Sequence, residues 1–267
     1  RKELLELLDE LSIEYVIGSE NATPHGTVET LEHAKIYAKL FRENAERIDG
    51  VLVILPNFGD ELGVVQTLDM AKLNVPVLVQ ACKDELDKVG VFSRRDAFCG
   101  KLSVCNNLYQ YNIPFTDTTF HTCDIKSQAF RDDLDRFSRI CRTVKGLTNA
   151  RIGAIGARPA AFQTVRYSEK LLQSSGITIV PVDLSEIFAA AKAFDDNAAQ
   201  VQEKLDAIRA YGTIPAKFPD EQVLRQAKFS VAVDDWMEVN ECVASAVQCW
   251  TSMQDNYGCA SCLSMSM

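Results

Sequence analysis

Two short apolar runs constrain the fold of this chain more than any other feature of its sequence. They are Gly50–Pro56 and Pro76–Ala81, each opened by glycine or proline and rich in valine, leucine and isoleucine. Runs of this length and composition are typical of strands that are covered on both faces in a parallel sheet. The Asp60–Leu73 segment between them supplies a crossover helix, so the sequence predicts a right-handed βαβ unit.

Other elements of the first half follow from apolar periodicity. A helical face begins at Leu4, Glu14–Gly18 is strand-like, Val28–Ile48 and Ser127–Val144 are amphipathic helices, and Leu102–Cys105 is a weaker candidate strand. In a flavodoxin-like sheet, the strand that would precede the first helix is central. Its absence from the numbered sequence would leave neighbouring strands with unpaired backbone groups.

The alternation of predicted strands and helices begins again after Gly146. Arg151–Gly156 and Ile177–Val182 are predicted strands, with a predicted helix over Phe162–Ser174. Further helical patterns lie at Ser185–Phe194, Ala198–Ala210 and Gln222–Met253, the last interrupted by apolar Phe229–Val233. The sequence therefore predicts an α/β protein with two tandem open, flavodoxin- or Rossmann-like parallel-sheet domains, over residues 1–146 and 147–267.

Charge and composition narrow the possible partners. The chain carries 37 acidic and 28 basic residues, a net charge of −9, which disfavours binding to nucleic acid or to an anionic membrane. No apolar stretch approaches the roughly 18 residues needed to cross a bilayer, and acids stand among the first residues where a signal peptide would be apolar. We expect a cytoplasmic protein. Its nine cysteines are scattered, so most are expected to be buried free thiols.

Ligands of open parallel sheets bind beyond the carboxyl ends of the strands. The loops after Leu55, Ala81, Cys105 and Gly156 are therefore expected to share one rim. The first of these loops contains Phe58, whose ring could pack against the carbons of a sugar. The alternative is a plain helix entry, with the acids that follow Phe58 complementing the helix dipole.

Two further groups of polar residues are candidate ligand contacts. Asn107 and Gln110 belong to a run of amides and a hydroxyl that suits hydrogen bonding to a polyol, although asparagines also build turns. Arg158 ends a Gly-x-x-Gly turn, where it is either a ligand contact or a structural clamp. That turn is not the dinucleotide fingerprint, because the third glycine is absent.

The sequence predicts no catalytic or metal-binding residue within these 267 positions. The three histidines are far apart and follow no ligand pattern. Cys259 and Cys262 form one C-x-x-C pair, which is only half of a structural zinc site. Asp234–Asp235 could hold a hard cation, but a solvated helix start is the favoured interpretation.

Several segments together resemble the L-fucose/L-arabinose isomerase superfamily, in particular its fucose isomerase-like members. They are Asp49–Val53, Arg94–Gln110, Gly153–Arg166, Asp183–Glu186 and Gln248–Trp250. The resemblance implies an aldose–ketose isomerase that works through an enediol with a divalent cation, typically Mn²⁺. It also implies two tandem α/β domains, a C-terminal β-rich domain that is absent here, and a homo-oligomer with shared active sites.

The resemblance also implies roles for individual residues. Phe58 matches an aromatic residue that lines the sugar pocket, and Asn107 with Gln110 matches an Asn-x-x-Gln that reaches a neighbouring subunit's substrate. Tyr111–Pro114 stands where arabinose-type enzymes carry a histidine and an arginine, so the sugar is not specified. The family's metal-ligand motifs do not occur in this sequence.

We therefore expect the intact protein to be a metal-dependent isomerase of fucose, arabinose or a related sugar, assembled as a trimer or hexamer. Because the sequence lacks an initial methionine and stops at Met267 without a polar tail, it is expected to be a fragment that is inactive alone. The alternative is a cytoplasmic two-domain sugar-binding or sugar-sensing protein. A third possibility is a fragment with only a structural role in assembly.

Overall fold

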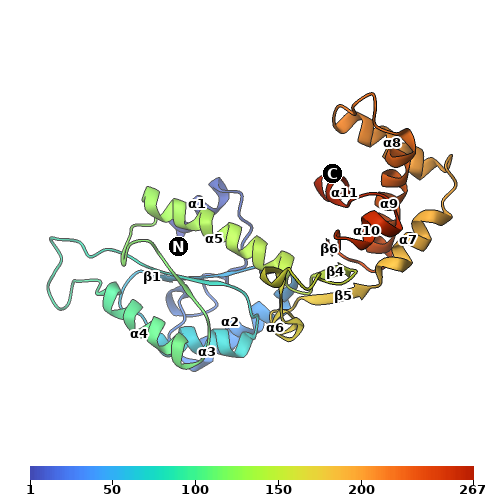
Figure 1. Cartoon of the computed structure of the whole chain (residues 1–267). Coiled ribbons are helices and arrows are strands. Elements are labelled where there is room, and N and C mark those ends of the chain that lie inside the picture. Colours follow the sequence, from blue (N-terminus) through green and yellow to red (C-terminus); the bar gives the residue numbers. More distant parts are fainter. The chain divides into compact units, whose positions relative to one another are not determined.

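The computed structural model describes all 267 residues, and the chain divides into two compact units, Arg1–Lys145 and Gly146–Met267 (Figure 1). Each unit is built on one three-stranded sheet whose strands are all parallel. Helices connect the strands in both units. The predicted fold class, two tandem parallel-sheet α/β domains, is confirmed.

The sheet of the first unit has the order β1-β2-β3, with bounds Val51–Leu55, Val77–Ala81 and Thr116–Asp117. The two apolar runs thus form adjacent parallel strands, in a register that pairs Val51 with Val77. The crossover helix between them is α3 (Glu61–Ala71). A side-chain oxygen of Asp60 accepts a hydrogen bond from the Gly63 N–H at 2.7 Å, which fixes where this helix begins.

Helices cover both faces of the first sheet (Figure 1). On one face, α3 and α4 (Ala97–Gln110) pack on Val77 and Val79. On the other, α1 (Lys2–Glu10) and α5 (Gln128–Leu147) pack on Leu78. α2 (Leu31–Glu43) packs against α3. Burial on both faces explains why these strands are continuous apolar runs.

Two predicted strands of the first unit are wrong. Leu102–Cys105 lies inside α4, because Ala97, Val104 and Leu108 recur at helical spacing and all three are buried. Glu14–Gly18 is extended but pairs with no strand. The short β3, by contrast, was not predicted, because two residues are too few to show the apolar pattern of a strand.

The sheet of the second unit has the order β5-β4-β6, with bounds Thr178–Val182, Arg151–Ile155 and Ala244–Val247. The two strands predicted here, β4 and β5, are confirmed. The helices of this unit are α6 (Glu169–Ser174), α7 (Leu184–Ala193), α8 (Ala199–Tyr211), α9 (Asp220–Val239), α10 (Ser252–Asn256) and α11 (Cys262–Ser266).

Three predictions for the second unit need correction. Phe229–Val233 does not interrupt a helix but lies within α9, whose apolar residues pack into two separate clusters on different sides. A helix that is buried on several sides is apolar all round, so it can resemble a strand in sequence. The helix ends at Val239, and β6 follows. Phe162–Ser174 forms only a 3₁₀ turn, Gln163–Val165, and the short α6.

All nine cysteines are free, but only Cys123 and Cys141 are buried, and Cys99 and Cys262 are exposed. The expectation that most would be buried is therefore wrong. No helix in the structure combines the length and apolar character needed to cross a bilayer.

Candidate functional site

The loop after β1 is fixed in place by the start of α4. The Phe58 N–H donates a hydrogen bond to the Arg95 carbonyl at 2.8 Å. A Cβ added to Gly100 would lie 1.7 Å from the Phe58 carbonyl oxygen, so only glycine lets the helix pass this close to the loop. The Phe58 side chain remains 45% exposed. The structure thus brings Phe58 beside the beginning of the Arg94–Gln110 stretch.

An ionic clamp joins the loops after β1 and β2. The Arg95 guanidinium donates to the Pro56 carbonyl at 3.1 Å and to a Glu85 carboxylate oxygen at 2.8 Å. A carboxylate oxygen of Asp84 accepts from the backbone N–H of Arg95 at 2.9 Å. Hydrogen bonds from Lys88 and Arg95 lower the pKa of Glu85, so its carboxylate is held in the charged form. The charged groups of this clamp are therefore engaged in hydrogen bonds with one another.

Lys101 is the one buried cation at this edge and was missed by the sequence analysis. Its side chain is 3% exposed and forms an ion pair with Asp117, which is 48% exposed. Its ammonium also donates to Thr118 Oγ1 at 2.8 Å and to the His121 carbonyl at 3.0 Å. The available signal was a lysine at helical spacing between the buried positions of α4.

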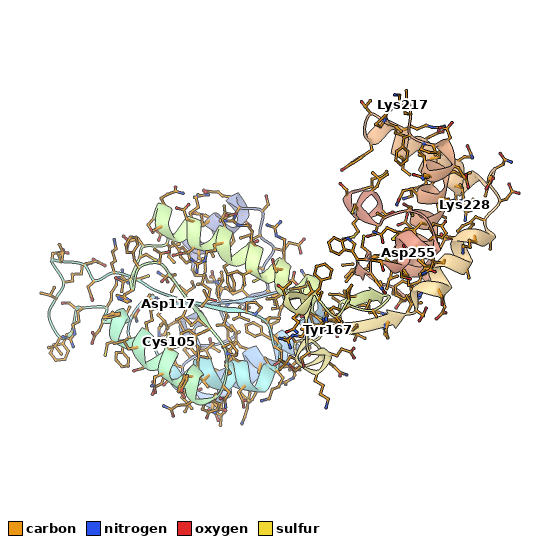
Figure 2. All side chains as sticks on the ribbon, in the orientation of Figure 1. Cys105, Asp117, Tyr167, Lys217, Lys228 and Asp255 are labelled. Atoms are coloured by element: carbon orange, nitrogen blue, oxygen red, sulfur yellow. The ribbon has the colours of Figure 1, made fainter.

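Cys105 lies beside Asp117 (Figure 2). Burial, with the Asp117 carboxylate adding to it, raises the pKa of the Cys105 thiol to about 11. A thiol with so high a pKa is a poor nucleophile at neutral pH. The charged groups and the thiol described in this region are therefore paired or unreactive.

Asn107 and Gln110 lie near the far end of α4. A helix rises about 1.5 Å per residue, so they stand roughly 10 and 15 Å along the axis from Gly100. The Gln110 amide donates to Asn106 Oδ1 at 2.5 Å. α4 connects two parallel strands and runs back along the sheet, which places its end at the amino edge. Within this unit, the structure does not bring these two residues to Phe58.

The expected common rim is therefore wrong in part. The loops after Leu55 and Ala81 do meet, through the clamp described above. Cys105 is inside a helix, and Gly156 belongs to the other unit. The site of each unit has to be considered by itself.

A crevice of about 810 Å³ lies at the carboxyl ends of the strands of the second unit. Val182, Leu184 and Phe188 form apolar parts of its lining. Its polar lining comes from Asp183, Ser185, Lys192, Gln248, Ser252 and Asn256. Apolar walls with a few convergent polar groups are typical of small-molecule sites.

Gln248, the residue directly after β6, organises this crevice. Its Oε1 accepts a hydrogen bond from the Ala157 N–H at 2.7 Å, so it joins the ends of β6 and β4. Gly156 between them has a φ of +81°, and a Cβ there would lie 2.6 Å from the same Gln248 oxygen. Glycine is required for both reasons. β5 and β6 flank β4 on opposite sides, which makes this the switch point where ligands of α/β sheets bind.

Asp183 and Lys192 supply the charges of the crevice. Asp183 begins α7 by accepting a hydrogen bond from the Ser185 N–H at 2.8 Å. Hydrogen bonds from Ser185 lower the pKa of Asp183, so it stays a carboxylate. The Lys192 ammonium donates to the Asn256 carbonyl at 3.4 Å and lies 6.0 Å from the centre of the Tyr257 ring.

Arg158 and two aromatic rings stand next to this switch point. One guanidinium nitrogen of Arg158 donates to the carbonyls of Pro159, Ala160 and Phe162, at 3.0, 3.3 and 3.2 Å. The Phe162 ring packs on Trp250, with centroids 5.1 Å apart. Trp250 is 59% exposed. Arg158 therefore does serve as a clamp on its own loop, while its role as a ligand contact stays a prediction.

The structure contains no group of three or more His, Cys, Asp or Glu side chains that could hold a metal ion. Asp234 forms an ion pair with Lys204 at 2.6 Å. The residues of this chain therefore do not fit a metal centre.

The fold is that of an α/β protein whose second unit carries a crevice at a switch point, where small molecules bind in sheets of this kind. A sequence model of the fucose/sulfoquinovose isomerase N-terminal domain matches residues 1–148. The chain therefore belongs to the fucose/sulfoquinovose isomerase family, which confirms the resemblance seen in its sequence.

Individual relatives agree with this assignment. Sulfoquinovose isomerases of Priestia aryabhattai and Priestia megaterium are each 27% identical to this chain over 269 residues, or 99% of this chain and 57% of the relative. That of Alkalicoccus urumqiensis is 24% identical over 200 residues, or 73% of this chain and 42% of the relative. The chain spans about half the length of the curated relatives that it matches.

Proposed function

We propose that the intact protein is a sugar aldose–ketose isomerase, and that this chain contributes part of the sugar site at the crevice of the second unit. The observation that carries the proposal is that sulfoquinovose isomerases align with 99% of the chain. The crevice supports it physically, because amide and hydroxyl groups can bind sugar hydroxyls while an exposed indole packs on ring carbons.

Sulfoquinovose, a sulfonated hexose, is the first substrate to test, because it is named in the curated relatives. A sulfonate requires cationic donors. Arg158 is an exposed residue next to the crevice, and a single guanidinium nitrogen makes its three hydrogen bonds to the loop. Lys192 lines the crevice itself. Fucose and arabinose are the competing substrates.

Isomerisation through an enediol moves a proton between C2 and C1 of the sugar and needs an acid–base group. Asp183 is held as a helix cap with a lowered pKa, so it is poorly suited to that task. We propose that the acid–base groups, and a divalent cation such as Mn²⁺, are supplied outside the 267 residues described here. This chain alone should then bind sugar without turnover.

The direct test is to assay the full-length gene product with sulfoquinovose, fucose and arabinose, before and after removal of divalent cations, and to titrate the 267-residue chain with the same sugars. Turnover by the full protein and binding alone by the chain would support the proposal. Turnover by the chain would overturn the division of roles. Binding without turnover by the full protein would favour the sugar-binding alternative.

We also propose that the protein acts in the cytoplasm as a homo-oligomer, a trimer or hexamer. The loop between β2 and α4 supports assembly, because it exposes four large apolar side chains: Leu86 at 93%, Val89 at 65%, Val91 at 75% and Phe92 at 104%. Such clusters mark interaction surfaces. Phe92→Ser should lower the mass measured by light scattering, whereas Leu171→Ser, at an exposed leucine of the second unit, should not.

A further inference from the structure

β1 forms one edge of the first sheet, and its outer side pairs with no strand. Val51 and Leu55 direct their backbone groups toward the β2 side. Because these groups alternate along a parallel strand, the N–H and C=O of Leu52 and Ile54 point away from β2. No hydrogen bond to these outward groups is recorded.

A second row of unpaired backbone lies in Glu14–Ile17. This segment is extended, and none of its N–H or C=O groups is hydrogen-bonded within the protein. Its sequence is rich in strand-forming residues, yet Tyr15 is 40% and Ile17 37% exposed. A strand-like sequence with exposed apolar side chains and free backbone is a template for pairing.

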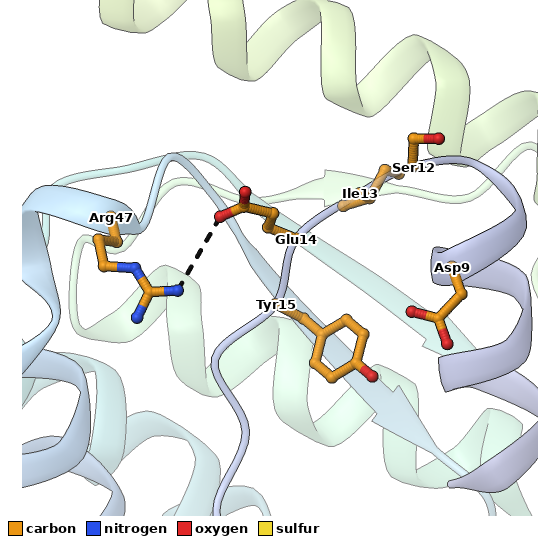
Figure 3. Close-up of a pocket in the computed structure, with 6 residues that line it drawn as sticks. All are labelled: Asp9, Ser12, Ile13, Glu14, Tyr15 and Arg47. Atoms are coloured by element: carbon orange, nitrogen blue, oxygen red, sulfur yellow. Dashed lines mark ion pairs between the residues drawn. The ribbon is translucent and has the colours of Figure 1, made fainter.

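A cavity of about 590 Å³ lies between this segment and the turn that leads into β1. Its lining includes Glu14 and Tyr15 from the segment and Arg47 from η2 (Ala45–Arg47), just before β1. Figure 3 shows the Arg47 guanidinium and the Glu14 carboxylate facing each other, with 3.9 Å between their nearest atoms. The contact bridges the segment and the turn, and no backbone hydrogen bond joins the two.

We propose that the free edge of β1 and this cavity accept one extended polypeptide segment, which lies parallel to β1 between it and Glu14–Ile17. The outer side of β1 and the Glu14–Ile17 segment both carry free backbone donors and acceptors. An extended polypeptide presents donors and acceptors alternately along its two sides, so it can pair with both. The exposed Tyr15 and Ile17 favour apolar side chains at alternate positions. The inference does not depend on the isomerase activity.

The position of Arg1 offers a way to supply such a strand experimentally. The Arg1 guanidinium donates to the Gly18 carbonyl at 2.5 Å, at the carboxyl end of the extended segment. A strand placed ahead of Arg1 would therefore end within the reach of one arginine side chain from that end of the segment. Five residues match the length of β1.

The test is to fuse Val-Ile-Val-Thr-Val ahead of Arg1 in the full chain and to measure amide hydrogen exchange. The matched control carries Val-Pro-Val-Pro-Val, since proline removes the backbone donors. The proposal expects exchange at the amides of Leu52 and Ile54 to slow at least about fivefold, the factor for one net hydrogen bond, with the strand and not with the control. Amides within Glu14–Ile17 should slow with them, and those of β4 should not change.

Three results would overturn the proposal. One is unchanged exchange at Leu52 and Ile54 in the strand fusion. Another is equal slowing in the proline control, which would show a non-specific effect of the extension. The third is protection of these amides in the unfused chain that rises with protein concentration, because the occupant would then be a second copy of the chain.

Discussion

The two units share an architecture but differ at the carboxyl edge of the sheet. In the first unit, this edge is filled by groups that bind one another: the Arg95 clamp and the buried Lys101 with its three partners. In the second, the same edge opens into a crevice of about 810 Å³ beside an exposed tryptophan. One parallel-sheet plan therefore supports a closed edge and an open one, and only the open edge offers unoccupied space to a ligand.

The difference traces to the residue that follows each strand. After β1 and β2, the loops carry ions that pair with α4, and Gly100 lets that helix close over the loop. After β6, Gln248 binds across to the loop after β4 instead and lines the open crevice. We therefore expect mutations at the first edge to change stability and mutations at the second to change ligand affinity.

The largest effect is expected for Gly100→Ala. Its new Cβ would lie 1.7 Å from a backbone oxygen, which cannot move like a flexible side chain. We expect the free energy of unfolding to fall by about 3 kcal/mol or more in chemical denaturation. Gly146→Ala is the control, because no atom lies within 4 Å of a Cβ there. Equal stability of the two variants would contradict a closed first edge.

The next effect concerns Cys105 thiol reactivity. With a pKa raised from 9.0 to about 11, Cys105 carries on the order of 100-fold less thiolate at pH 8 than an ordinary cysteine. Alkylation followed by mass spectrometry should label exposed Cys99 first, and Cys105 should become reactive only as the pH approaches 11. Rapid labelling of Cys105 at pH 8 in the folded chain would show that this edge is open.

Lys101→Met should lower the free energy of unfolding by about 2 kcal/mol, because it removes a buried cation and leaves the His121 carbonyl without its donor. The loss is moderated because Asp117 is half exposed, so water can take over its hydrogen bonds. Sugar affinity should be unaffected. Lys35→Met, at an exposed position on α2, is the control for removing a charge. A loss of affinity without a loss of stability would move the sugar site to the first unit.

The apolar runs that form β1 and β2 could be read from the sequence because burial on both faces leaves an unbroken apolar signal. The same rule misassigned Leu102–Cys105 and Phe229–Val233, where helices are buried and the sequence is again nearly continuous in apolar residues. Short apolar runs do not distinguish a covered strand from a covered helix. The helical spacing of the apolar residues around each run does distinguish a helix from a strand, but it became evident only when the neighbouring elements were known.

The candidate site was predictable in part. Arg158, which lies next to the crevice, was identified from its glycine-containing turn, whereas Phe58, also predicted as a sugar contact, lies at the edge of the first unit. Gln248 was not identified as a site residue, because β6 is the weakly apolar sequence Ala-Ser-Ala-Val and its end could not be located. Lys101 was missed because its partners come from β3 and the following loop, which only the fold brings to α4.

The smallest effect, and the one that bears most directly on the open edge, is expected for Gln248→Ala. It removes the bridge from β6 to the Ala157 N–H and one amide from the crevice, which should weaken sugar binding by about 1 kcal/mol, or roughly fivefold in Kd. Exposed Trp250 next to Gln248 provides a fluorescence signal for the titration. Gln173→Ala, on the surface of α6, is the matched control. If both variants bind sulfoquinovose as well as the parent chain, with stability unchanged, the crevice is not where the sugar binds, and the two edges differ in shape without differing in use.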